Sequence, residues 1–103
     1  MYNTNVTSAV GKAWALHRNG DNDQAAKEFE RLLSQNADDL DANFGLGLVL
    51  KALGSKDKAL TTFQKTVELT AKGLSEKPGD DRLMMLRRMS QQRIAEINKL
   101  AAD

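Results

Sequence analysis

The chain of 103 residues is poor in reactive and metal-binding side chains: it has no cysteine, one histidine, one tryptophan and one proline. Without cysteine there is no disulfide, no thiol nucleophile and no thiolate ligand for a metal. His17 alone provides neither a metal-ligand spacing nor a nucleophile and base pair. A glycine-rich phosphate-binding loop is missing as well. We therefore expect a protein that is not an enzyme and that has no cofactor and no metal site.

Long apolar runs are also missing. Nowhere do 18 apolar residues follow one another, so insertion into a membrane is not expected. The first ten residues, MYNTNVTSAV, have neither the basic start nor the apolar stretch of a secretory signal. The lack of cysteine suits a reducing compartment. Together these features predict a cytoplasmic location.

Neither sign of charge is in large excess, because the formal net charge is +1. Binding to nucleic acid through phosphate attraction is therefore not expected. The halves nevertheless differ: residues 1–50 hold four basic and seven acidic side chains, whereas residues 51–103 hold eleven and seven. This difference either favours a head-to-tail contact or reflects solvated helix faces. The late basic residues point around a helix in several directions instead of forming one stripe; they are Arg82, Arg87, Arg88, Arg93 and Lys99.

The chain contains two similar segments of ten residues. GDNDQAAKEF begins at Gly20, and GSKDKALTTF begins at Gly54, 34 residues later. A shift of the sequence by 34 residues gives seven identical pairs, whereas average composition gives about two. An internal repeat of one structural unit is therefore predicted. The identical pairs are Gly11/Gly45, Leu16/Leu50, Gly20/Gly54, Asp23/Asp57, Ala25/Ala59, Phe29/Phe63 and Ala37/Ala71.

Each copy has the pattern of two helices joined by a tight turn. Apolar residues from Val6 to Leu16 recur every three or four positions, and Gly20 suits the left-handed end of a helix. Asp21 and its counterpart Ser55 are good N-cap residues for the second helix of each copy. Small and large residues return at fixed columns, which permits close helix packing. The small ones are Ala13, Ala25, Gly47 and Ala59, and the large ones are Phe29 and Phe63.

Acidic residues gather before the third predicted helix, which begins near Leu40: Asp38, Asp39 and Asp41. They could attract a cation, but N-capping and the helix dipole explain them better.

This combination resembles the tetratricopeptide repeat family, whose unit is a helix-turn-helix of 34 residues. The resemblance covers residues 6–73, and it implies an all-α fold, a right-handed superhelical array of antiparallel helix hairpins. On the first helix the family's small residue, large residue and turn glycine match Ala13, Leu16, Gly20 and Gly47, Leu50, Gly54. On the second helix its alanine and aromatic match Ala25, Phe29 and Ala59, Phe63. The family's early tryptophan is replaced by Ala9 and Asn43, and its inter-repeat proline by Ala37 and Ala71.

We expect a single domain over residues 1–103, with about five helices. Repeat one spans 6–39, and repeat two spans 40–73 with its second helix extended to about residue 76. A break at Pro78-Gly79 precedes a C-terminal capping helix at about 80–102, which Asp80 or Asp81 can cap. The core-facing side of that helix is formed by Leu83, Leu86, Ser90, Ile94, Ile97 and Ala101.

In proteins that resemble this one, the first helices of successive hairpins line a concave groove that receives a peptide or helix of another protein. The resemblance places in that groove Thr7, Val10, Trp14, His17 and Arg18 from the first copy, and Asp41, Phe44, Leu48 and Lys51 from the second. Trp14 and Phe44 are the expected anchors, unless the N-terminal segment around Tyr2 covers them. Some members hold a C-terminal carboxylate with a lysine and an asparagine, which correspond here to Val10 and Trp14. A mainly apolar ligand, helical or extended, is therefore expected.

The last helix offers a second candidate surface. Met85 and Met89, with Leu100 further along, lie to one side of its core-facing stripe, and Met84 points the other way. These methionines either fill gaps against the preceding helix or form an apolar edge. Two functions thus stay open. One is an adaptor or scaffold that binds another protein in the groove, and the other is a homodimer or larger homo-oligomer joined through this edge.

Overall fold

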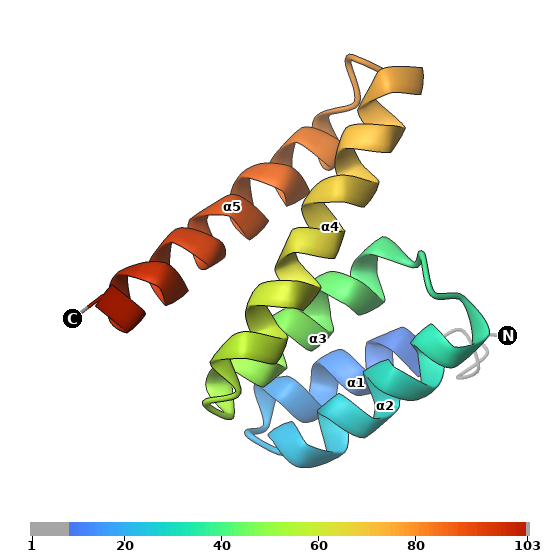
Figure 1. Cartoon of the computed structure of the whole chain (residues 1–103). Coiled ribbons are helices and arrows are strands. Elements are labelled where there is room, and N and C mark those ends of the chain that lie inside the picture. Colours follow the sequence, from blue (N-terminus) through green and yellow to red (C-terminus); the bar gives the residue numbers. More distant parts are fainter. Residues whose placement is uncertain (1–8, 103) are drawn as a thin grey trace, which may run out of the picture.

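The computed structural model describes residues 9–102, and within this range the chain forms five helices and no strand (Figure 1). The predicted all-α repeat fold is therefore confirmed. The helices are α1 (Ala9–Arg18), α2 (Asn22–Gln35), α3 (Leu40–Ala52), α4 (Lys56–Glu76) and α5 (Asp81–Ala102).

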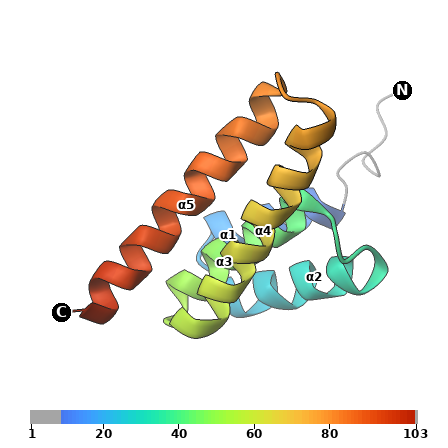
Figure 2. The same cartoon turned by 45° about the horizontal axis from the view of Figure 1, so that its top comes forward.

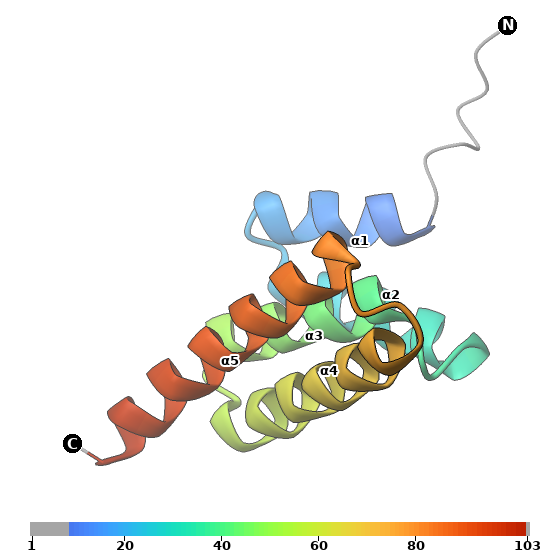
Figure 3. The same cartoon turned by 90° about the horizontal axis from the view of Figure 1, so that it is seen from above.

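The helices are arranged in two layers. Each helix packs against the next one along the chain, and α3 also contacts both α1 and α5. One layer therefore holds α1, α3 and α5, and the other holds α2 and α4. Figure 2 shows the long antiparallel pair of α4 and α5, and in Figure 3 α3 lies between α1 and α4. This arrangement brings three helices that are far apart in sequence to one face of the molecule.

The two hairpin turns have the same geometry. Gly20 and Gly54 have φ values of 84° and 82°, the left-handed conformation that glycine adopts without a steric penalty. In the first turn the N–H of Asp21 donates to the carbonyl of Leu16, and in the second the N–H of Ser55 donates to that of Leu50. The glycine N–H groups donate to the carbonyls of His17 and Lys51. The turns at Gly20 and Gly54 are thus both Schellman motifs.

Asp21 and Ser55 occupy the N-cap positions of α2 and α4, but their side chains accept no capping hydrogen bond. This corrects the expectation that these side chains cap. Their ψ angles are 61° and 70°, away from the extended conformation in which an N-cap side chain reaches the first-turn N–H groups.

The connection between the hairpins is held by the first turn of α3. Asp39 has an extended backbone, and its carboxylate accepts a hydrogen bond of 2.9 Å from the N–H of Ala42, as a capping residue does. Asn43 is 3% exposed, and its amide donates to the carbonyls of Ala37 at 3.0 Å and Asp39 at 2.8 Å. A buried amide therefore ties the turn to the helix that follows it. At the start of α5, Asp80 caps in the same way and accepts from the N–H of Leu83.

The core consists of two clusters that share Trp14 and Leu50 at their margins. Phe29 fills the first cluster and Phe63 the second, and both rings are completely buried. The first cluster contains Ala13, Ala25, Ala26, Phe29, Ala42, Leu46 and Val49. The second contains Phe44, Ala59, Phe63, Leu86 and Ile97, so α5 completes it. The fully buried Ser90 lies on the same side of α5 as these leucine and isoleucine side chains.

Candidate functional site

Trp14 is the central residue of the face formed by α1, α3 and α5. Its ring centroid lies 5.4 Å from that of Phe29, with the planes at 81°, and 6.4 Å from that of Phe44. Edge-to-face geometry of this kind is favourable for aromatic rings. Trp14 is only half-buried, although it packs on both clusters. The two core clusters therefore hold the indole in place, and part of it remains accessible to solvent.

Phe44 lies beneath this face. The ring is 5% exposed, and it is held between Trp14 and Phe63, whose centroid is 5.9 Å away. The expectation that Phe44 presents its ring to a ligand is therefore corrected: the second cluster, closed by α5, covers it. Phe44 supports the face from within instead of forming its surface.

The other predicted residues of α1 lie around Trp14. Val10 and His17 are half-buried, and Arg18 is exposed. Nδ1 of His17 lies 2.8 Å from Oδ1 of Asn22, which ties the end of α1 to the start of α2. Thr7, and Tyr2 with the segment expected to cover the groove, fall outside the described residues.

The predicted residues of α3 lie alongside α5. Leu48 is half-buried against the second cluster. Asp41 and Lys51 make ion pairs with α5: Oδ1 of Asp41 lies 2.8 Å from Arg82, and Nζ of Lys51 lies 3.1 Å from Glu96. Because the first pair joins the starts of the two helices and the second joins positions further along both, α3 and α5 run parallel. Sequence reasoning missed Arg82 and Glu96 as members of this face.

The methionines of α5 join the same face. Met89 is half-buried against the cluster that contains Phe44. Met85 lies between Arg82 and Met89 at helical spacings of three and four, so it is on the same side of α5. Its side chain is 51% exposed. The predicted groove and the predicted edge are thus parts of one surface. We call it the α1/α3/α5 face, and it comprises Val10, Trp14, His17, Asp41, Leu48, Lys51, Arg82, Met85, Met89 and Glu96.

Leu100, the third residue of the predicted edge, lies near the end of α5 and is 54% exposed. Together with Lys51, Glu96 and Lys99 it lines a hollow of about 370 Å³ between α3 and α5. The hydrogen bond from Lys51 holds the pKa of Glu96 below its usual value, and the Arg93 guanidinium acts in the same direction, while desolvation opposes them. Glu96 is therefore ionised in this hollow at neutral pH.

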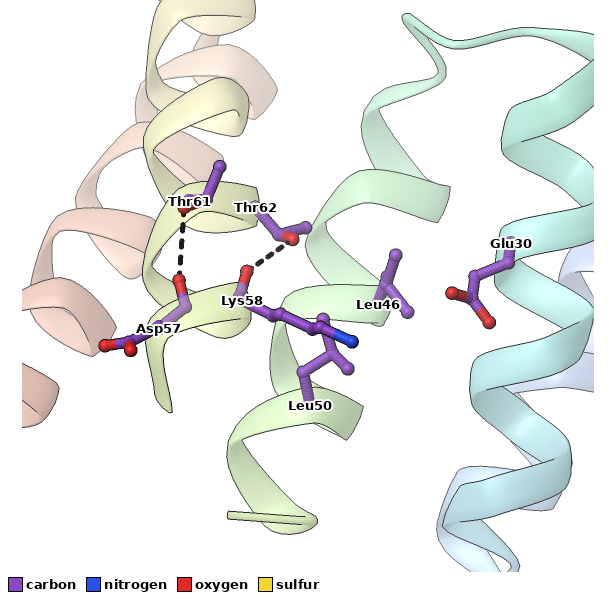
Figure 4. Close-up of a pocket in the computed structure, with 7 residues that line it drawn as sticks. All are labelled: Glu30, Leu46, Leu50, Asp57, Lys58, Thr61 and Thr62. Atoms are coloured by element: carbon purple, nitrogen blue, oxygen red, sulfur yellow. Dashed lines mark hydrogen bonds between the residues drawn. The ribbon is translucent and has the colours of Figure 1, made fainter. Parts of the chain in front are cut away.

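A second hollow, of about 400 Å³, is lined by residues of α2, α3 and α4 (Figure 4). Its floor is formed by Leu46 and Leu50, and Lys58 reaches across Leu50 toward Glu30. The hydroxyls of Thr61 and Thr62 donate to backbone carbonyls of their own helix. This hollow contains no nucleophile and base pair, and none of the predicted site residues line it.

Two further findings limit the chemistry of the described part of the chain. No group of three acidic or histidine side chains there is placed to hold a metal ion. No helix there is both long and apolar enough to cross a bilayer.

Comparisons with known proteins agree with the repeat seen in the structure. The Tetratricopeptide repeat pattern matches residues 10–73, more than half of the chain. Comparison with curated proteins and with solved structures gave no match. The matched residues run from the middle of the first turn of α1 to Gly73 of α4, and they include both Schellman turns. The chain therefore belongs to the tetratricopeptide repeat family.

Proposed function

We propose that this protein is an adaptor or scaffold that binds an apolar segment of another protein, helical or extended, on its α1/α3/α5 face. Tetratricopeptide repeats mediate protein–protein interactions and are typically not enzymes. The observation that carries the proposal is Trp14, an indole packed on both core clusters and still partly accessible to solvent. Rigid aromatic side chains of this kind dominate the energetics of protein interfaces.

The chemistry around Trp14 supports an apolar ligand. Met85 and Met89 provide flexible, polarisable surface that adapts to the shape of a partner. The charges of α3 on this face, Asp41 and Lys51, are already paired with residues of α5. The centre of the face therefore has few groups that would hold a charged ligand.

The test compares two neighbouring methionines of α5 that lie on different sides of the helix. Met85→Glu places a carboxylate on the α1/α3/α5 face, whereas Met84→Glu places one on the other side at a 37% exposed position. Both are better probes than a substitution at Phe44, because a carboxylate at that buried position would unfold the second cluster.

Wild type and both variants are used as baits in a lysate of the source cell, with circular dichroism to establish that all three are folded. We expect one partner to be retained by wild type and by Met84→Glu and to be lost with Met85→Glu. A purified partner should then change the fluorescence of Trp14, the one tryptophan of the chain. Equal capture by all three baits would contradict the proposal.

A homo-oligomer joined through Met85, Met89 and Leu100 is the second candidate. It is favoured by the exposure of Met85 and Leu100, which are 51% and 54% accessible. Light scattering over a range of concentrations decides the matter. A dimer mass for wild type and a monomer mass for a double variant, Met85→Glu with Leu100→Glu, would support this candidate. A monomer mass for wild type at all concentrations would exclude it.

A further inference from the structure

The hollow between the ends of α3 and α5 continues the α1/α3/α5 face. Lys51 follows Leu48 by three residues on α3, and Glu96 follows Met89 by seven on α5, so each lies on the same side of its helix as the apolar residue. The hollow of about 370 Å³ is lined by Lys51, Glu96, Lys99 and Leu100, and we call it the basic hollow. Leu100 and the aliphatic stems of the two lysines give it apolar walls. It has room for an apolar side chain of a segment bound along the face.

Positive charge is in excess at the basic hollow. Both oxygens of Glu96 are engaged, Oε1 by Nζ of Lys51 at 3.1 Å and Oε2 by Arg93 at 2.9 Å. Lys99 makes no ion pair in the described part of the chain. Three cations therefore surround one carboxylate.

The ends of α3 and α5 reduce this excess without cancelling it. Lys51 and Lys99 lie in the last turns of these helices, and a helix C-terminus acts as about half a negative charge. Among the described residues, an excess of about one positive charge then remains at this place. The opposite end of the face has no such excess, because Asp41 is paired with Arg82 there. A bound segment thus meets apolar surface along most of its length and positive charge at one end.

Resting on the function proposed above, we propose that the basic hollow receives an acidic residue of the bound segment, next to an apolar side chain that packs on Leu100. The acidic group interacts with Lys51, Lys99 and Arg93. A basic group at this position would be repelled, and a purely apolar one would leave the cations uncompensated. The partner is therefore an apolar protein segment with a carboxylate at one end of its contact.

The test uses two synthetic amphipathic helical peptides with the same leucine face. One carries two glutamates at one end and the other carries glutamines there, and both lack tryptophan and have equal helicity by circular dichroism. Binding is followed by the fluorescence of Trp14. We expect wild type to bind the glutamate peptide about fivefold more tightly, as estimated from partly exposed ion pairs. The preference should decrease at high salt.

Variants of the two lysines locate the contact. The preference should disappear in the double variant Lys51→Gln with Lys99→Gln. It should persist in Lys72→Gln, a control that removes the charge of an exposed lysine on α4. A preference that survives the double variant would overturn the inference.

The two peptides also separate this inference from the proposed function. Equal binding of both to wild type would refute the acidic contact and leave the apolar face as a binding site. No change of Trp14 fluorescence with either peptide would contradict the proposed function, and the inference would fail with it.

Discussion

A Cβ atom on Gly47 of α3 would stand 2.7 Å from Cε1 of Phe63 on α4. Gly45, on another side of α3, faces Phe29 of α2 in the same way. The helix at the centre of the molecule therefore carries no side chain at the two points where rings of its neighbours cross it. Both rings are fully buried, so the two core clusters depend on these two glycines.

Replacement of Gly47 by alanine tests this packing. Alanine is a better helix former than glycine by about 1 kcal/mol, but the added methyl group overlaps the ring of Phe63 and should cost about 1–3 kcal/mol. We expect a net loss in the free energy of unfolding of about 1 kcal/mol, and at most about 2 kcal/mol, measured by urea denaturation. Gly79→Ala is the control, because a Cβ there meets no atom within 4 Å. A Gly47→Ala variant as stable as wild type would show that Phe63 moves aside.

Asn43→Ala tests the connection between the hairpins. The change removes the buried side-chain amide that donates to the carbonyls of Ala37 and Asp39. We expect a loss of about 1–3 kcal/mol in the free energy of unfolding, because two hydrogen bonds of about 0.5–1.5 kcal/mol each are lost. Faster amide hydrogen exchange around residues 36–43 should accompany it. Asn36→Ala removes a hydrogen bond at an exposed position of the same turn, to the N–H of Asp38, and it should cost less. An equal loss in both variants would argue against a special role for Asn43.

Replacement of Ser90 should increase the stability of the protein instead of decreasing it. It is fully buried between α5 and the rest of the core, and its hydroxyl has no hydrogen-bond partner among residues 9–102. Ser90→Ala removes an unsatisfied polar group and introduces the best helix former, so we expect a gain of up to about 1 kcal/mol by thermal denaturation. Ser75→Ala is matched to it as an exposed serine of α4 whose hydroxyl does bond, to the carbonyl of Lys72. A gain smaller than that of Ser75→Ala would show that the Ser90 hydroxyl makes a stabilising bond.

Glu96 predicts a dependence of stability on pH. Its pKa in the folded protein lies below the ordinary value of 4.5, chiefly because Lys51 hydrogen-bonds to the carboxylate. The ionised form therefore stabilises the fold above the ordinary pKa, and this contribution is lost as the pH falls through the folded-state pKa. Glu96→Gln should be less stable than wild type at neutral pH, and the difference should decrease at an acidic pH below the ordinary pKa of 4.5. Urea denaturation at both pH values checks this. A difference of the same size at both would assign the effect to packing.

The sequence by itself determined the hairpins, because their signals are local. Gly20 and Gly54 take the left-handed conformation that a Schellman turn needs, and any chain with glycine at that place can adopt it. The columns of alanine and phenylalanine place small residues against large ones within each copy. An apolar column shows that a face is buried, but it leaves open what covers it. For that reason the burial of Phe44 did not follow from the sequence.

The tertiary structure decided the position of α5. With 21 residues, α4 is two helical turns longer than α2 with 14, so α5 lies outside the 34-residue register of the repeat. The ion pair of Asp41 and Arg82 joins residues 41 positions apart, a spacing that no repeat column predicts. Because α5 packs on α3 and α4 together, it covers Phe44 and packs Met89 against the same core cluster as Trp14. Local sequence could place the methionines on one side of a helix, and only the packing of three helices could make them part of the same face.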